Sequence, residues 1–428
     1  MSAFVVKGDI FYCKSLSETV SVKDGYVVCI DGRSAGVFEV LPEKFASLSI
    51  HDYSGKLVIP GLCDLHIHAP QYSFRGTGMD LELLDWLSRY TFPEEVKYAD
   101  TDYAYRAYSI FADDMKKSAT TRVSVFATVH CEATHILAEL LEKSGLYGFI
   151  GPVSMDREAP QKLCVPAPEG ITELDNWIDE NLCYNEHFLP IVTPRFVPCC
   201  SDELLRGLAE IRRKYALAVQ SHLSENPSEI ELVRTLCPYA EFYGDVYHKN
   251  ELFGVDKKGN SFKTVMAHCV HSTDAEIRLM AENGVFMAHC PASNANLSSG
   301  IAPVRKMLEN GVKVGLGTDV AGGHSKSVLR AVTDAVQISK LYNCLVDNNA
   351  KPLSFSESFY LATKGGGEFF GNVGSFEELY EFDAVVVDDS CYKTVCEQSV
   401  AERVEKFAYL SGENINLTAK YVQGNRIM

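Results

Sequence analysis

Eight short apolar segments, separated by stretches of helical periodicity, constrain the fold of this chain more than any other feature. Most of them are rich in Val, Ile and Phe and are apolar throughout rather than at every second residue. That pattern is typical of strands buried on both faces. The segments are Leu57–His68, Thr121–Thr128, Tyr147–Met155, Leu189–Arg195, Leu217–His222, Lys263–His268, Val285–His289 and Val312–Thr318.

The remaining stretches contain seven predicted amphipathic helices. These are Ala99–Ser118, His135–Lys143, Ile171–Asn181, Asp202–Lys214, Pro227–Leu236, Thr273–Asn283 and Val304–Asn310. Ser201 and Ser272 stand where helix caps are expected, and Asn283-Gly284 and Asn310-Gly311 end the last two helices. This alternation predicts an α/β fold, a (β/α)8 barrel of the TIM type, with a doubly wound open sheet as the structural alternative.

The two ends of the chain differ from this pattern and contain short strand-like pieces at 25–30, 382–388 and 420–423. We expect the terminal segments to pair into one small composite β domain beside the barrel. The predicted organisation is residues 1–57 and 376–428 as the two parts of the small β domain and residues 58–375 as the barrel.

The net charge, the hydropathy and the cysteines of the chain indicate which kinds of partner and which cellular compartment are expected. The net charge of −17 repels nucleic-acid phosphates and anionic lipid, so we expect neither nucleic acid nor a membrane as a partner. No apolar stretch is long enough to span a bilayer. The 14 cysteines form no Cys-x-x-Cys pair, so we expect no zinc ribbon. Residues 1–10 have no basic region followed by an apolar run and a cleavage site, so we expect a cytoplasmic protein with reduced thiols.

Four histidines and an aspartate stand at the ends of predicted strands. His66 and His68 are two residues apart and therefore share one face of the first strand. His222 ends the fifth strand, His268 ends the sixth, and Asp319 follows the eighth. Because active sites of such barrels form at the C-terminal ends of the strands, we expect these side chains to meet there around a metal ion.

A nitrogen and carboxylate ligand set with one open position suits zinc, with iron and manganese as alternatives. Zinc lowers the pKa of a bound water to about 7, so hydroxide becomes available near neutral pH. Glu225, three residues after His222, is placed to act as the general acid and base. The structural alternative is a carboxylate in the first turn of a helix.

Three further side chains are candidates for binding a flat, polar ligand. The amide of Gln71 can both donate and accept hydrogen bonds. Arg195 ends the fourth strand and can donate to a carbonyl oxygen, although a surface ion pair is an equal alternative, and Phe196 can stack on a ring. His289 also ends a strand, and we leave open whether it supports the site, contacts the ligand or is structural.

These residues lie within recognisable motifs. PGLCDLHIH at 60–68 and GLGTD at 315–319 resemble the first and last metal motifs of the amidohydrolase superfamily. Longer stretches resemble the guanine deaminase family. They are HIHAPQYSFRG at 66–76, DWLSRYTFP at 85–93, VTPRF at 192–196, QSHLSEN at 220–226 and GTDVAGG at 317–323.

The resemblance implies one zinc ion per chain and hydrolytic deamination of guanine to xanthine and ammonia, in which metal-bound hydroxide attacks carbon 2. It implies a cytosolic homodimer. It assigns the metal to His66, His68, His222 and Asp319. It assigns catalysis to Glu225, as the proton shuttle, together with His268 and Asp319. It assigns the binding of guanine to His68, Ala69, Gln71, Arg195, Phe196, His222, Glu225 and Asp319.

Two departures from the family pattern leave the substrate open. Pro70 stands where a small polar residue is expected, and Arg75 where Ala is commoner. The alternatives are a deaminase of another aminopurine, a pterin or a triazine. A catalytically silent scaffold is the alternative outside enzymes, and it is expected to lose metal ligands, whereas all of them are present here.

Overall fold

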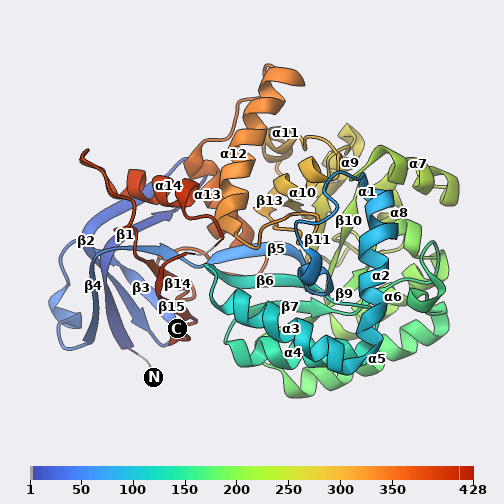
Figure 1. The fold of residues 1–428 in the computed structure, drawn as a ribbon, viewed down its shortest axis with the longest axis horizontal. Coiled ribbons are helices and arrows are strands. Elements are labelled where there is room, and N and C mark those ends of the chain that lie inside the picture. Colours follow the sequence, from blue (N-terminus) through green and yellow to red (C-terminus); the bar gives the residue numbers. More distant parts are fainter. Residues whose placement is uncertain (1–2, 414) are drawn as a thin grey trace.

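The computed structural model describes residues 3–413 and 415–428, and it contains two β units (Figure 1). One is a barrel surrounded by helices, and the other is a mixed sheet built from both ends of the chain. Residues 1, 2 and 414, which fall in the predicted segments 1–57 and 376–428, lie outside the described residues. The boundaries of those segments stay predictions.

The barrel consists of eight parallel strands that follow one another in chain order around its wall. They are β5 (Leu62–His68), β6 (Thr120–Phe126), β7 (Tyr147–Gly151), β9 (Phe188–Pro194), β10 (Ala218–Leu223), β11 (Thr264–His268), β12 (Phe286–His289) and β13 (Lys313–Leu316). The last strand meets the first through two backbone hydrogen bonds, from Asp319 to His66 (2.8 Å) and from His68 to Val320 (3.1 Å). The predicted barrel is confirmed, and this seam excludes an open sheet.

Two of the predicted apolar segments are each divided in the structure. The run Leu57–His68 is shared between β4 (Ser49–Pro60), which belongs to the other sheet, and β5. The run Tyr147–Met155 becomes β7 and the short β8 (Val153–Ser154), which pairs with β9, because Pro152 has no N–H to continue a ladder.

The seven predicted helices are present, with ends that differ by a few residues. The longer helices are α3 (Thr101–Lys116), α4 (Cys131–Ser144), α5 (Ala167–Tyr184), α6 (Asp202–Tyr215), α7 (Pro227–Leu236), α9 (Asp274–Glu282), α12 (Val328–Leu345) and α14 (Val400–Leu410). Shorter helices are α8 (Tyr243–Lys249), α10 (Pro291–Asn296), α11 (Val304–Glu309) and α13 (Phe355–Tyr360). Ser201 caps α6 as predicted, but α9 is capped by Thr273 rather than Ser272. No helix in the described part of the chain is long and apolar enough to cross a membrane.

The second unit is a seven-stranded mixed sheet in the order β16-β15-β14-β4-β1-β2-β3. Its strands are β1 (Ala3–Cys13), β2 (Thr19–Ile30), β3 (Arg33–Phe38), β4, β14 (Ala384–Val387), β15 (Leu417–Val422) and β16 (Asn425–Arg426). Phe4 packs against both Phe382 and Tyr421, with ring centroids 5.4 Å apart in each pair. The two ends of the chain thus share one core, and the predicted composite domain is confirmed.

A broken helix precedes α3 and reaches the barrel mouth. It comprises α1 (Leu83–Trp86), a π-helical turn (Leu87–Thr91), α2 (Phe92–Glu95) and a final turn (Val96–Ala99). Figure 1 shows α1 and α2 end to end beside the barrel. We call residues 83–99 the mouth helix.

Candidate active site

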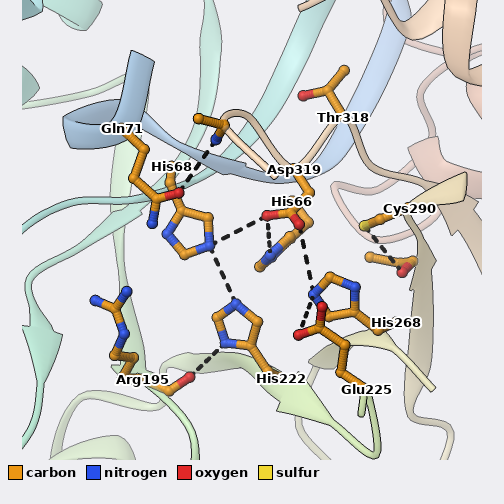
Figure 2. Close-up of polar contacts among 12 residues, drawn as sticks. His66, His68, Gln71, Arg195, His222, Glu225, His268, Cys290, Thr318 and Asp319 are labelled. Carbon is orange, nitrogen blue, oxygen red and sulfur yellow. Dashed lines mark hydrogen bonds and ion pairs between the residues drawn. The ribbon is translucent and has the colours of Figure 1, made fainter. Parts of the chain in front are cut away.

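The four predicted metal ligands converge at the C-terminal end of the barrel (Figure 2). The ligand atoms of His66, His68, His222 and Asp319 all lie within 4.8 Å of one another, and we call these residues the His/Asp cluster. Oδ1 of Asp319 is 3.1 Å from Nε2 of His66 and 3.4 Å from Nε2 of His68. Nε2 of His222 is 3.2 Å from Nε2 of His68.

The barrel seam brings the first and last residues of the cluster together. His66 and His68 alternate with Ile67 on β5, so both imidazoles face the same side. Asp64, which sequence reasoning did not assign, is buried below them. Its Oδ1 accepts from the backbone N–H of His66 (3.2 Å) and Thr318 (3.0 Å), and its Oδ2 accepts from Thr318 Oγ1 (2.5 Å).

The imidazoles of the His/Asp cluster are in a protonation state that favours binding of a cation. Nδ1 of His222 lies 2.5 Å from the carbonyl oxygen of Arg195, and because a carbonyl only accepts, Nδ1 carries the proton. The lone pair of Nε2 therefore faces the cluster. Burial, followed by neighbouring imidazoles, lowers the pKa of His68 and His222 well below the usual range, and burial also lowers the pKa of His66.

Nε2 of His66 is buried and has no hydrogen-bond partner among the described residues. Three imidazoles of lowered pKa and one carboxylate, whose ligand atoms lie together, form a donor set that zinc prefers. The residues of the His/Asp cluster thus fit the predicted metal.

Glu225 and His268 lie beside the cluster. Nε2 of His268 is 3.4 Å from Glu225 Oε2 and 3.8 Å from Asp319 Oδ2. Ser299 Oγ donates to Glu225 Oε1 at 3.1 Å. Burial, with the charge of Asp319 adding to it, raises the pKa of Glu225 to about 8. Glu225 precedes α7 rather than lying in its first turn, and Asn226 is the cap.

Two polar residues that the sequence analysis did not single out orient this pair. Asn294 Oδ1 is 2.9 Å from Nδ1 of His268, on the side away from the cluster. Glu229 accepts from the backbone N–H of Glu225 at 3.0 Å and so fixes the chain just before α7.

A cavity opens over the cluster, and its empty space, counted out to the open side, is about 390 Å³. The predicted ligand-binding residues Gln71, Arg195 and Phe196 line it. The complete lining is His68, Gln71, Leu83, Trp86, Leu87, Arg195, Phe196, His222, Glu225, His268, Leu297 and Asp319. The apolar residues of the mouth helix and Leu297 were not predicted. Ala69 and His289 are buried but do not belong to the lining formed by the described residues.

Arg195 is buried, so the alternative of a surface ion pair is wrong. Its Nη1 lies 2.7 Å from Oε2 of Glu95, a fully buried carboxylate that was not predicted, and its guanidinium lies 5.2 Å from the ring centroid of Phe92. Its backbone carbonyl holds His222. One residue thus serves both the cluster and the cavity, as Figure 2 shows.

A barrel with this cluster at the C-terminal ends of its strands defines a known class of hydrolase. Residues 57–425 match the amidohydrolase family, and the chain belongs to that family. The predicted family and the prediction of a hydrolase are confirmed.

Within this class, several similar proteins are guanine deaminases. That of Dictyostelium discoideum is 40% identical over 387 residues, covering 89% of this chain and 84% of the relative. That of Homo sapiens is 38% identical over 402 residues, covering 90% and 85%. A crystal structure of guanine deaminase from C. acetobutylicum with guanine bound in the active site is 44% identical, with a TM-score of 0.95 over 100% of both chains. The predicted resemblance to guanine deaminases is confirmed.

Proposed function

We propose that this protein hydrolyses guanine to xanthine and ammonia with one zinc ion per chain. The observation that carries the proposal is the cavity itself, in which the His/Asp cluster and Glu225 face Gln71, Arg195 and Phe196. The full-length similarity to a guanine deaminase with guanine in its active site supports the choice of substrate.

The His/Asp cluster would hold the zinc. When bound, zinc supplies a water of lowered pKa that is a nucleophile near neutral pH. The remaining chemistry belongs to the chain. His268 and Asp319, whose Nε2 and Oδ2 atoms are 3.8 Å apart, would bond to the hydroxyl that forms on carbon 2 in the proposed reaction.

Glu225 would move the protons. In the proposed reaction its carboxylate would take a proton from the attacking water and deliver it to the ring nitrogen beside carbon 2. It would then pass the proton of the new hydroxyl on carbon 2 to the departing amine, and that hydroxyl would become the carbonyl of xanthine. Its location supports this role, because it is 3.4 Å from His268, lines the cavity and is held by Ser299. A carboxyl group that is buried and positioned in this way is suited to general acid–base catalysis.

The cavity would bind the purine through a polar side and an apolar side. Arg195 would donate to the carbonyl oxygen on carbon 6, and Gln71 would bond to the ring edge. Phe196 and the apolar side chains of the mouth helix, Leu83, Trp86 and Leu87, would cover the ring faces.

Ammonia release from a panel of ligands tests the substrate. Guanine, adenine, an aminopterin and an aminotriazine are incubated with the purified protein, and we expect release from guanine alone. Release only from a pterin or triazine would contradict the proposal in favour of another deaminase, and release from none would favour a silent scaffold.

Elemental analysis tests the cofactor. We expect about one zinc per chain, and His66→Ala, which removes one ligand, is expected to lower zinc content and activity together. Removal of the metal by a chelator is expected to abolish ammonia release, and added zinc to restore it. Two tightly held metal ions per chain would contradict the single-zinc site.

We also propose a cytosolic homodimer, on the resemblance to guanine deaminases. The unpaired state of the cysteines supports a reducing compartment. Light scattering is expected to give twice the mass of the 47.4 kDa chain, and a monomeric mass would contradict the dimer.

A further inference from the structure

We propose that Glu95 is a positioning residue for purine recognition, because its carboxylate holds both Gln71 and Arg195 against the cavity. This inference rests on the proposed function and extends it to a residue outside the cavity wall. It makes the affinity for the purine depend on a buried carboxylate that the substrate never touches.

The geometry assigns one oxygen of Glu95 to each partner. Oε2 accepts from Arg195 Nη1 at 2.7 Å, and Oε1 accepts from Gln71 Nε2 at 3.2 Å. Glu95 has no exposed surface and is not part of the cavity lining, whereas Gln71 and Arg195 are. Its carboxylate therefore reaches the cavity lining through these two side chains.

For Gln71, the carboxylate fixes the direction of the amide. Gln71 Oε1 accepts from the backbone N–H of Ala321 at 3.2 Å, while its Nε2 donates to Glu95. An amide between an acceptor and a donor cannot flip without losing both bonds. One N–H and one lone pair are left, and their directions are set before the ligand arrives.

For Arg195, the carboxylate compensates the charge. A buried guanidinium without a counterion is costly, and the ring of Phe92 supplies only a weak additional attraction. Because Glu95 uses Nη1, the other nitrogens remain available to a carbonyl oxygen of a neutral purine. An uncompensated Arg195 would be free to turn and would favour anionic ligands instead.

The position of Glu95 also ties two sides of the cavity together. It ends α2, in the same mouth helix as Leu83, Trp86 and Leu87, which form the apolar wall. The bonds from Glu95 to Gln71 and Arg195 therefore fix the mouth helix relative to β5 and β9.

The adjacent Glu94 supplies a matched control. It is nearly buried and comes from the same turn, but its carboxylate accepts from Tyr103 Oη and from Lys97 Nζ (2.6 Å), neither of which lines the cavity. Glu94→Gln and Glu95→Gln thus remove the same charge from neighbouring positions, and the two differ in whether the partners face the purine.

The test compares these variants in the zinc-loaded full chain by binding and kinetics. Hypoxanthine, which has the carbon 6 carbonyl of guanine but no amine to release, serves as the unreactive probe in calorimetry. For Glu95→Gln we expect the Kd of hypoxanthine and the KM of guanine to rise ~10- to 100-fold, with a much smaller change in kcat. Glu94→Gln is expected to leave all three near the wild-type values.

Glu95→Asp and a double variant make the result specific. Aspartate keeps the charge but cannot reach both partners, so we expect a Kd between those of Glu95→Gln and the wild type. Arg195→Met removes the cation that Glu95 compensates, so Glu95→Gln can be tested in this background even if the single variant does not fold. Adding Glu95→Gln to Arg195→Met is expected to change the Kd of hypoxanthine less than ~3-fold.

Equal values of hypoxanthine Kd in Glu95→Gln, Glu94→Gln and the wild type would overturn the role of Glu95 while leaving the proposed function intact. A wild-type protein that neither binds hypoxanthine nor releases ammonia from guanine would instead overturn the proposed function together with this inference.

Discussion

Glu225 is the residue on which proton transfer depends in the proposed reaction. Replacing it by Gln preserves its shape and an acceptor for Ser299 but removes the ability to carry a proton. General acid–base groups typically contribute ~100- to 10,000-fold, and we expect kcat for guanine to fall by that range in Glu225→Gln. Ammonia release measures the loss, and elemental analysis is expected to show unchanged zinc.

Glu231→Gln is a suitable control for this prediction, because Glu231 is a mostly exposed residue of α7 that pairs only with Arg234. Its turnover is expected to match the wild type. Near-normal turnover in Glu225→Gln would remove Glu225 from the proposed role.

Arg195 is the residue on which the choice between purines depends. It can donate to the carbonyl of guanine, but adenine presents an amine there and has no amine on carbon 2. A site built to bond one polar group can reject an analogue that lacks it by ~10,000-fold or more, so we expect guanine to be deaminated and adenine not. Arg195→Ala is expected to raise the KM of guanine strongly.

Zinc content is the control for Arg195→Ala, since the substitution keeps the backbone carbonyl that orients His222. Loss of zinc in this variant would mean that the side chain also supports the metal site. Comparable rates on adenine and guanine would contradict the predicted pocket.

The residues of the His/Asp cluster could be found from the sequence because each stands at the end of an apolar run, where a histidine or aspartate is conspicuous. Glu95 and Ser299 could not be found in this way. Glu95 occurs in a helix beside Glu94, and the local sequence pattern is the same whether a glutamate there faces solvent or a buried arginine. Their burial depends on tertiary contacts that no local pattern records.

At the scale of elements, the seam between β13 and β5 decides whether the metal ligands meet. Asp64 on β5 holds Thr318 beyond β13 through two hydrogen bonds, and Thr318 adjoins Asp319. Thr318→Val keeps the shape but leaves the buried carboxylate with one donor fewer. Hydrogen bonds to charged groups contribute about 1.5–3 kcal/mol, and we expect urea unfolding to show a loss of that size.

Thr120→Val is the matched control, because Thr120 is buried on β6 and its Oγ1 has no partner among the described residues. We expect little change in the free energy of unfolding for that variant. Equal losses in the two variants would show that Val itself, rather than the bond to Asp64, is responsible.

The barrel strands were predictable because strands covered on both faces have mostly apolar residues, rather than an apolar residue at every second position. The same property concealed the break at Gly61, since the last four residues of β4 are apolar and buried like β5, although the two strands belong to different sheets. The mouth helix was missed because π and 3-10 turns interrupt its periodicity.

At the scale of the whole molecule, two buried basic side chains join the barrel to the small sheet. Lys420 on β15 donates to the carbonyls of Lys116 and Ser118 (3.1 Å each) at the end of α3, where the helix dipole favours a positive charge. Arg122 on β6 donates to both oxygens of Asp383 (2.6 and 2.9 Å) and to Glu381 (2.7 Å). The sequence spacing of these partners gives no hint of either contact.

Arg122→Met tests how strongly the two units depend on each other. Methionine keeps much of the apolar stem, but Asp383, which is fully buried, loses its counterion. Breaking a buried pair by removing one partner costs about 3 to 5 kcal/mol, and we expect that loss in urea unfolding. Arg122 lies near the start of β6, the end opposite the cavity, so zinc content and the KM of guanine are expected to persist in the folded variant.

Lys143→Met, which removes a mostly exposed pair with Glu139, is expected to change stability by less than about 1 kcal/mol. If Arg122→Met were no less stable than Lys143→Met, the ion pair would not be what holds the sheet to the barrel, and the shared apolar contacts would have to suffice.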